Sequence, residues 1–476
     1  MDSKKHRKQA MFGSLWILFG FGTSQVLRLS SNLVLAHLLF PEAFGIMALV
    51  NIFVQGLQMF SDIGIGPSII QNRKGNDPDF LNTAWTIQVI RGFFLWIACC
   101  LIAWPVSRFF AHNEHAQHEL FWIMPVIAFS ALISGFNSTS LFTLNRDLRM
   151  GAITILDIVP QIISLLAMGL LAWIHPSVWA LVAGSTVYSL IRLAMSHWMY
   201  LPLHNRFQWD MEAVAEIRKF GKWIILGSIV SFLAANLDRL VLGKLLTLKE
   251  LGVYSMALTF ARVGTEVTAR LSNTVLFPIL SRSQHDPVTL VGQSLKARGL
   301  ILLSGGSLAC AFAISSPLFF HYCYDHRYAN AGPISQWLCL TIWFTIVLNS
   351  MERVPMALGH SRALFVSNIL TTLGYAVAIP SYWSWGLPGF IVGLCSGLIL
   401  AHLALLAWIP VRRQEMLIQT GIFSAIFFAY GGGMVYLMKV FSGQMDEHAR
   451  IVFGLIASSI PCLIAGFFAT HRLRSV

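Results

Sequence analysis

Apolar runs long enough to cross a lipid bilayer follow one another along almost the whole chain. A membrane helix needs about 20 apolar residues to cross a hydrocarbon core of ~30 Å, and here only short polar breaks separate the runs. Of the 476 residues, 56% are hydrophobic and 11% are charged, whereas a soluble globular chain carries roughly 25% charged residues. The sequence therefore predicts an all-α polytopic membrane protein.

Fourteen transmembrane helices are predicted from these runs. Four basic residues precede the first run, but that run is too long for a signal peptide and ends without a small-residue cleavage site, so we expect it to be retained. The predicted spans are 12–39, 44–71, 82–107, 119–145, 151–174, 177–201, 222–246, 251–281, 296–323, 331–358, 363–383, 387–409, 417–440 and 450–470.

The distribution of basic residues predicts the orientation. If the N-terminus is cytoplasmic, the inner segments carry 20 Lys and Arg residues and the outer segments carry 6. This asymmetry places both termini in the cytoplasm. It accounts for most of the net charge of +12, which points to anionic lipid headgroups as partners and not to nucleic acid. The seven cysteines show no metal-type spacing, and we expect neither a metal nor a cofactor.

The chain contains an internal repeat. When the sequence is shifted by 207 residues, ten of the 31 positions from 16 to 46 are identical, and the matches include Trp16, Gly20, Ser24 and Gly45. Six predicted helices separate the two copies, so both copies enter the membrane in the same direction. Parallel repeats of this kind pack as two bundles about a pseudo-two-fold axis along the membrane normal, with the substrate site between them.

This repeat predicts the domain organisation. Residues 1–201 are expected to form an N-terminal lobe of six helices, and residues 222–409 a C-terminal lobe of six helices. Residues 410–476 add two further helices. The longest polar segment, 202–221, is expected to be a cytoplasmic linker that contains a short amphipathic helix, for which Asp210 is a suitable first residue.

Arginines inside the apolar runs are the first candidate site residues. A charge at the centre of a membrane helix costs ~2.5 to 3.5 kcal/mol, so such residues normally face a partner or a water-filled cavity. Guanidinium groups grip phosphate oxygens two at a time. Arg192 and Asp157 are left out, because one lies near a helix end and the other can cap its neighbour. Six arginines are predicted to line a cationic substrate cavity: Arg28, Arg91, Arg239, Arg262, Arg270 and Arg353.

Carboxylates and backbone breaks complete the candidate set. Arg262, Glu266 and Arg270 lie four residues apart on one helix face, so the glutamate can pair with either arginine. Carboxylates inside membrane helices either form ion pairs that hold helices together or couple transport to the movement of a proton or sodium ion. Gly64, Gly66 and Pro67 interrupt the second run and are predicted to form a hinge. The carboxylate candidates are Asp62, Asp238, Glu266 and Glu352.

Two segments resemble a known family. "MFSDIGIGPSIIQNRKGNDPDFLNTAW" (59–85) and "NLDRLVLGKLLTLKELGVYSMA" (236–257) are similar to the polysaccharide transporter family of the multidrug/oligosaccharidyl-lipid/polysaccharide exporter superfamily. The resemblance implies a bacterial inner-membrane flippase and not an enzyme. Its substrate would be an undecaprenyl-diphosphate-linked oligosaccharide, which alternating access would move to the periplasmic leaflet, and its partners would include membrane lipids and a polysaccharide polymerase or other assembly machinery.

Other functions remain open at this point. A flippase for the peptidoglycan lipid precursor would also have fourteen spans and a cationic cavity. A membrane glycan ligase or polymerase would act on the same lipid carrier, but the predicted outer loops are too short for the periplasmic domain of such enzymes. The sequence does not choose between the membrane potential and an exchanged ion as the driving force.

Overall fold

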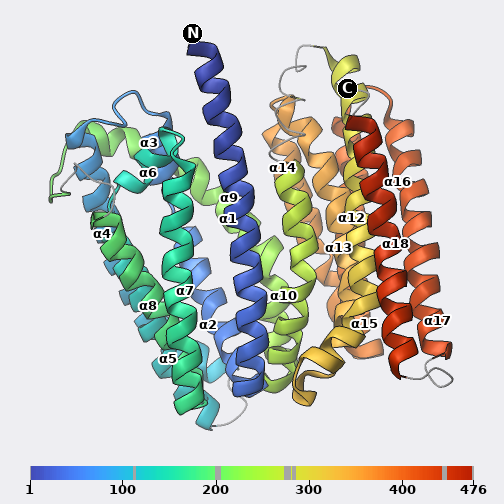
Figure 1. Ribbon diagram of the computed structural model, residues 1–476. Coiled ribbons are helices and arrows are strands. Elements are labelled where there is room, and N and C mark those ends of the chain that lie inside the picture. Colours follow the sequence, from blue (N-terminus) through green and yellow to red (C-terminus); the bar gives the residue numbers. More distant parts are fainter. Residues whose placement is uncertain are drawn as a thin grey trace. The chain divides into compact units, whose positions relative to one another are not determined.

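The computed structural model describes residues 2–110, 114–198, 205–272, 280, 286–441 and 447–473. Within these ranges every regular element is a helix (Figure 1). Contacts divide the chain into two compact units, residues 1–252 and residues 253–476.

Unit 1 consists of long helices joined by short loops, with two short helices, α3 and α6, in contact with each other. Long helices α4 and α5, α7 and α8, and α1 and α7 pack against one another. The helices are α1 (Asp2–Leu38), α2 (Pro41–Phe60), α3 (Ile65–Gln71), α4 (Pro78–Phe110), α5 (Glu114–Gly135), α6 (Ser140–Arg146), α7 (Met150–Ile174), α8 (Val178–Trp198) and α9 (Met211–Leu245).

Unit 2 begins inside α10 (Leu248–Leu271). The first turn of this helix belongs to unit 1, and the rest belongs to unit 2. Its centre is the packing of α12 on α13, and α12 also contacts α16 and α18. The remaining elements are α12 (Pro287–Cys323), η2 (His326–Tyr328), α13 (Ala331–Ala357), α14 (Ser361–Leu373), α15 (Tyr375–Leu405), η3 (Leu406–Trp408), α16 (Arg413–Phe427), the π-helix η4 (Phe428–Gly432), α17 (Gly433–Phe441) and α18 (Glu447–Leu473).

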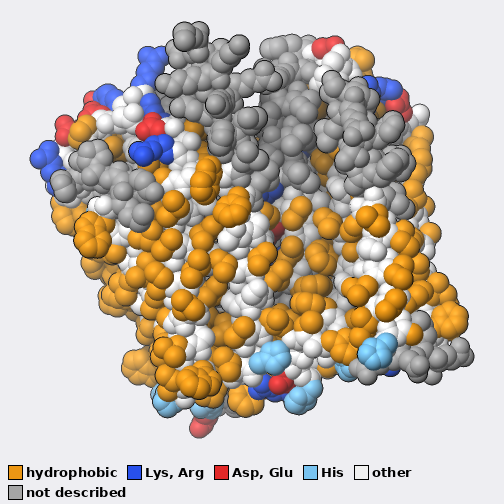
Figure 2. Space-filling model, in the orientation of Figure 1, with side chains coloured by type: hydrophobic (Ala, Val, Ile, Leu, Met, Phe, Trp, Pro, Cys, Tyr) orange, Lys and Arg blue, Asp and Glu red, His pale blue; other side chains and the backbone are white. Residues whose placement is uncertain are grey.

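Large apolar side chains cover the outside of these helices. Phe94, Leu101 and Trp173 are each at least 70% exposed, which in water would be a large unfavourable patch but in lipid is the expected surface. On the face drawn in Figure 2, apolar side chains line the flanks of the helices, and charged and histidine side chains gather near helix ends. Nine helical stretches of the described residues are long and apolar enough to cross a membrane. The protein is a multi-pass membrane protein.

The predicted linker is not a separate helix. Helix α9 runs without a break from Met211 to Leu245, so the amphipathic segment is the first part of that helix; residues 202–204 lie outside the described residues. Asp210 is the N-cap, as expected, and accepts hydrogen bonds from the N–H groups of Glu212 and Ala213.

Extended residues 205–210 lie along α4. The N–H groups of Arg206, Gln208 and Asp210 donate to Asn82, Thr86 and Thr83 at 3.0–3.1 Å. Because alternate residues of an extended chain face the same side, this segment is bound to α4 at every second residue.

Helix ends differ from the ends of the apolar runs in several places. The predicted span 44–71 is broken between Phe60 and Ile65, where Gly64 adopts φ 67°, and the span 119–145 is broken between Gly135 and Ser140. By contrast, the break expected between 383 and 387 is a kink inside α15 at Gly386, which adopts φ 64°. A left-handed residue cannot continue an α-helix, and glycine takes that conformation at no steric cost.

Gly45 and Gly252, which match each other in the sequence repeat, are in close contact. A Cβ on Gly45 would lie 2.0 Å from the carbonyl oxygen of Leu248, and a Cβ on Gly252 would lie 1.8 Å from that of Pro41. Leu248 and Pro41 are also 207 residues apart. The starts of α2 and α10 therefore cross in a symmetric manner, at a distance that only glycine permits.

Asp325 caps the short helix η2 between α12 and α13. Its carboxylate accepts hydrogen bonds from the side chain and the backbone N–H of Arg327, at 2.8 and 2.9 Å, and these bonds lower the pKa of Asp325 to about 2. The unfolded value is about 3.9. Because the folded pKa is the lower one, the stabilisation is complete above about pH 4 and is lost as the pH falls toward 2.

We therefore expect Asp325→Asn to lower the free energy of unfolding at pH 7 by about 1 kcal/mol, after allowance for solvent screening, and so to lower the thermal midpoint. The difference from wild type should shrink between pH 4 and pH 2. Thermal unfolding of the detergent-solubilised protein across this pH range measures it, and a difference that stays constant with pH contradicts this role of the carboxylate.

Candidate functional site

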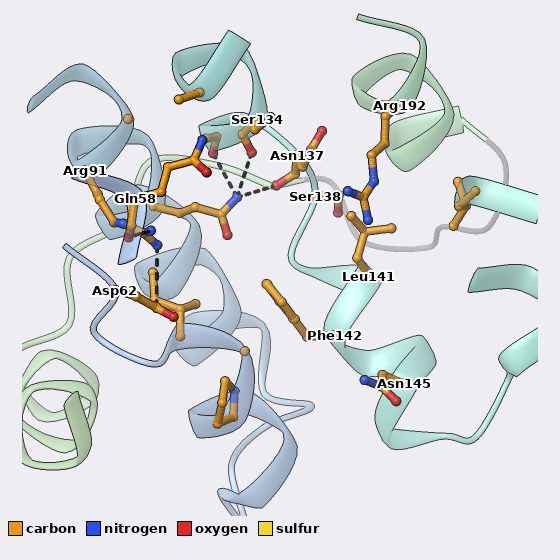
Figure 3. A pocket seen from close by; sticks show the side chains of 18 of the residues that line it. Gln58, Asp62, Arg91, Ser134, Asn137, Ser138, Leu141, Phe142, Asn145 and Arg192 are labelled. Atoms are coloured by element: carbon orange, nitrogen blue, oxygen red, sulfur yellow. Dashed lines mark hydrogen bonds and ion pairs between the residues drawn. The ribbon is translucent and has the colours of Figure 1, made fainter. Parts of the chain in front are cut away.

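A pocket of about 550 Å³ lies entirely within unit 1 (Figure 3). Its walls come from α2 to α8, at the two places where the predicted spans are broken. These are the loop of residues 61–64 between α2 and α3, and the loop of residues 136–139 between α5 and α6. Breaks in membrane helices are tolerated where the backbone lines a cavity, and both breaks do so here.

Arg91 of α4 holds the first of these loops. Its Nε donates to Ser61 Oγ at 3.0 Å and its Nη2 donates to the carbonyl oxygen of Gln58 at 2.8 Å. Its Nη1 lies 3.6 Å from Asp62 Oδ1, and the same oxygen accepts the N–H of Gly64 at 2.9 Å. Arg91 thus satisfies a carbonyl in the last turn of α2 and orders the turn that leads into α3.

A second ion pair closes another side of the pocket. Arg192 of α8 lies 3.0 Å from Asp157 of α7, and the side chain of Asp157 is 48% exposed. We had left out these two residues on sequence grounds, yet they line the pocket together with Asp62 and Arg91. The sequence does contain a signal: both residues lie at a similar distance from the short turn that joins α7 and α8, so antiparallel packing brings them to the same depth.

Amide and hydroxyl groups form the rest of the polar lining. The Gln88 side-chain amide donates to the carbonyl oxygens of Ser134, Gly135 and Asn137 at 3.0–3.3 Å, which fixes the end of α5 against α4. Ser138 donates to Asn205 at 2.6 Å. Among the described residues, the side-chain oxygen of Asn137 has no hydrogen-bond partner, although the residue is only 8% exposed. Buried acceptors normally have a partner, so this oxygen is available to a ligand or to water.

Phe142 provides an aromatic surface. Its ring lies against Gly66, where a Cβ would come within 2.8 Å of the ring edge, and Figure 3 shows the ring directed into the pocket. Gly66 and Pro67 of the predicted hinge also line the pocket. Motion at this hinge stays a prediction, because one conformation is described.

The other predicted site residues do not line this pocket. Arg28 lies in α1, and Asp238 and Arg239 lie in α9, where Arg239 donates to Asn236 at 2.5 Å. Arg262, Glu266 and Arg270 lie in α10, and Glu352 and Arg353 lie in α13. Glu352 accepts a hydrogen bond from Ser367 at 2.9 Å. Of the predicted residues, Asp62, Arg91, Gly66 and Pro67 are the ones that line this pocket. The role of the others stays a prediction.

Arg298 is a buried arginine that sequence reasoning missed. The count of inner basic residues includes Arg298, at the start of the predicted span 296–323, but α12 begins nine residues before that span, at Pro287, and Arg298 is 0% exposed. Its guanidinium donates to Ser350 of α13 and to Met416, Gln419 and Thr420 of α16, at 2.7–3.2 Å. Arg298 therefore joins three helices of unit 2.

The described residues that line the pocket carry no surplus charge. Its two arginines and two carboxylates cancel formally, and its remaining polar groups are amides and hydroxyls that both donate and accept hydrogen bonds. Such a site can bind a neutral ligand rich in hydroxyl groups, and it does not have the excess positive charge that a diphosphate requires.

Comparison with known proteins agrees with the resemblance of the two segments. A family described as "Polysaccharide biosynthesis protein" matches residues 34–333. The lipopolysaccharide biosynthesis protein WzxC of Escherichia coli (strain K12) is 20% identical over 404 residues, which cover 83% of this chain and 79% of that protein. The succinoglycan biosynthesis transport protein ExoT of Rhizobium meliloti (strain 1021) is 24% identical over 255 residues, 53% of this chain and 50% of that protein.

Among solved structures, the lipid II flippase MurJ in an inward closed conformation has a TM-score of 0.69 and 13% identity, over 97% of this chain and 99% of that one. This likeness shows the fold. The family match spans well over half of the 476 residues. The chain belongs to this family of polysaccharide biosynthesis proteins.

Proposed function

We propose that the protein is a flippase that moves an undecaprenyl-diphosphate-linked oligosaccharide from the cytoplasmic to the periplasmic leaflet for surface polysaccharide biosynthesis. The observation that carries the proposal is a polar pocket inside a bundle of apolar membrane helices in a chain of a polysaccharide biosynthesis family. A relative named as a transport protein and a fold shared with a lipid flippase support it. Transport accounts for the pocket without any catalytic group.

The arrangement that goes with this function has fourteen transmembrane helices, as two six-helix lobes related by a pseudo-two-fold axis and two C-terminal helices. It lies in the bacterial inner membrane with both termini in the cytoplasm, in keeping with the excess of basic residues in the inner segments. Alternating access then exposes the substrate site first to the cytoplasm and later to the periplasm. In this orientation the pocket of unit 1 lies toward the cytoplasmic ends of α2 and α5, because Gln58 and Ser134 line it.

The membrane potential is sufficient to drive the step. A diphosphate with a charge of about −2 that crosses the whole field toward the positive outside gains roughly 4.6 kcal/mol per 100 mV. Proton or sodium exchange at an intramembrane carboxylate is the other coupling scheme. Transport in vesicles, with the potential and the pH gradient set independently, separates the two.

The test is the location of the substrate in cells that lack the protein. Lipid-linked repeat units should accumulate and should remain inaccessible to a glycan-modifying enzyme added to spheroplasts, because they stay in the cytoplasmic leaflet. Units that accumulate in the periplasmic leaflet would instead indicate a membrane glycan ligase or polymerase.

A flippase for the peptidoglycan lipid precursor is the second candidate, because MurJ shares the fold. Complementation tests it directly: the gene is expressed in a bacterium depleted of its own lipid II flippase. We expect no rescue, since the family match is to polysaccharide biosynthesis proteins. Growth at normal rate favours the peptidoglycan precursor as the substrate.

A further inference from the structure

We infer that the pocket of unit 1 binds the sugar portion of the transported lipid, and that the diphosphate is bound elsewhere. This inference rests on the proposed function and assigns part of the substrate to a particular site. Three features of the pocket carry it: its charge balance, its polar groups and its aromatic wall.

The charge balance argues against a diphosphate. Asp62 and Asp157, whose side chains are 45% and 48% exposed, would face the ligand, and each is already beside its arginine at 3.6 and 3.0 Å. A diphosphate placed here would meet two like charges and would have to compete with them for the guanidinium groups. The guanidinium of Arg91 also has two other polar partners around the end of α2, Ser61 and the carbonyl oxygen of Gln58, so it is not available as a phosphate fork.

The polar groups suit hydroxyls. A sugar hydroxyl donates one hydrogen bond and accepts others, as do the amides and hydroxyls of the lining. Asn137 offers a buried oxygen that has no partner within the part of the chain that the structure describes, and the exposed side chain of Asn145 projects from α6. Carboxylates strengthen this set, because hydrogen bonds to an ionised acceptor are roughly twice as strong as neutral ones.

The aromatic wall suits the faces of sugar rings. The C–H groups of a pyranose face are weakly positive, and the face of an aromatic ring is negative. Phe142 is held in place by Gly66 below it and by its packing on the core of Ile65, Ile69 and Phe80. A pocket of about 550 Å³ is within the range of about 300–1,000 Å³ that small-molecule sites occupy.

The experiment measures equilibrium binding of two lipids to the full-length protein in detergent. One probe is the lipid-linked oligosaccharide extracted from the producing bacterium, and the other is undecaprenyl diphosphate without sugar. Asn145→Ala and Phe142→Leu are the test variants, since Asn145 is exposed and leucine keeps most of the bulk at 142. Asn76→Ala, an exposed amide in the loop before α4, is the matched control.

Each test variant should weaken binding of the glycosylated lipid by about three- to tenfold, the value of one hydrogen bond or ring contact. Binding of the bare diphosphate lipid should be unchanged, and Asn76→Ala should change neither. An equal loss for both lipids overturns the inference, because it assigns the pocket to the diphosphate or to folding. No loss for either lipid overturns it as well. If the wild-type protein binds neither lipid, the proposed function itself fails.

Discussion

Replacing Arg298 by alanine is expected to cause one of the largest losses of stability that any single substitution can cause in unit 2. The side chain is fully buried and donates four hydrogen bonds across α12, α13 and α16. Its loss leaves a void and deprives the Gln419 side-chain oxygen of its donor. Unsatisfied buried groups cost ~1–3 kcal/mol each, so the sum is about 3 kcal/mol or more.

A loss of this size should lower the thermal midpoint by roughly 6–12 °C, if unit 2 unfolds as one body. Amide hydrogen exchange should increase most in α16, because α16 supplies three of the four acceptors. Arg298→Lys should be intermediate, since an ammonium is a compact charge without the planar fork of donors. Arg73→Ala, in an exposed loop, is the control. A melting curve of Arg298→Ala that coincides with that of the control contradicts this role.

Other contacts of α16 make the prediction specific to Arg298. Gln419 donates back to the carbonyl oxygen of Leu295 at 2.9 Å, and Trp343 of α13 both donates to Ser424 at 3.1 Å and stacks on Phe427. These contacts should keep α16 attached in the variant. The expected result is therefore a loosened helix in a folded protein and not global unfolding at room temperature.

The sequence predicted an all-helical membrane protein correctly and predicted helix ends poorly, for a physical reason. Hydropathy reports the length that must match the bilayer, but a helix continues beyond the lipid as long as its backbone hydrogen bonds can form. Helix α12 has 37 residues, more than about 20 residues that a membrane requires. Because α12 extends beyond its apolar run, Arg298 was counted outside the membrane helix. The same kind of extension makes the predicted linker helix the first part of α9.

In the candidate site, too, the sequence predicted some features and missed others. Gly64, Gly66 and Pro67 marked the break between α2 and α3, because glycine and proline leave a signal in the sequence. The break at residues 136–139 was missed, although Asn137, Ser138 and Thr139 form a polar interruption in an apolar run. The pairing of Arg192 with Asp157 depends on how α7 and α8 pack, and we did not use the signal that the sequence offers, the similar distance of both residues from the turn between these helices.

Charged residues inside the membrane thus fall into different classes that the sequence cannot separate. Arg91 and Arg298 are both held by several hydrogen bonds that join helices, yet Arg91 lines the pocket of unit 1 and Arg298 is fully buried between helices of unit 2. A count of arginines and carboxylates within the predicted spans gives only the excess of positive charge. Only the positions of their partners show which guanidinium groups order the fold.

Substituting Gly45 or Gly252 by alanine should cause the second large effect, through steric overlap. A Cβ at Gly45 or Gly252 would lie 2.0 or 1.8 Å from a backbone carbonyl oxygen. Because the obstructing atom belongs to the main chain, no rotamer change can relieve the overlap, and the helices must separate. Overpacking typically costs about 1–3 kcal/mol and occasionally more. We expect a large reduction in monodisperse protein, measured by size-exclusion chromatography after solubilisation.

A double-mutant cycle gives this prediction its sharpest form. If both glycines serve one close crossing of α2 and α10, the first alanine widens it and the second adds little, so the two effects should be strongly non-additive. Gly169→Ala and Gly421→Ala are matched controls, because nothing lies within 4 Å of a Cβ at either position. Both should be neutral or slightly stabilising, since alanine favours a helix over glycine by about 1 kcal/mol. Additive effects at Gly45 and Gly252 would mean that each glycine is required for a separate reason, and that the symmetric crossing is not the constraint.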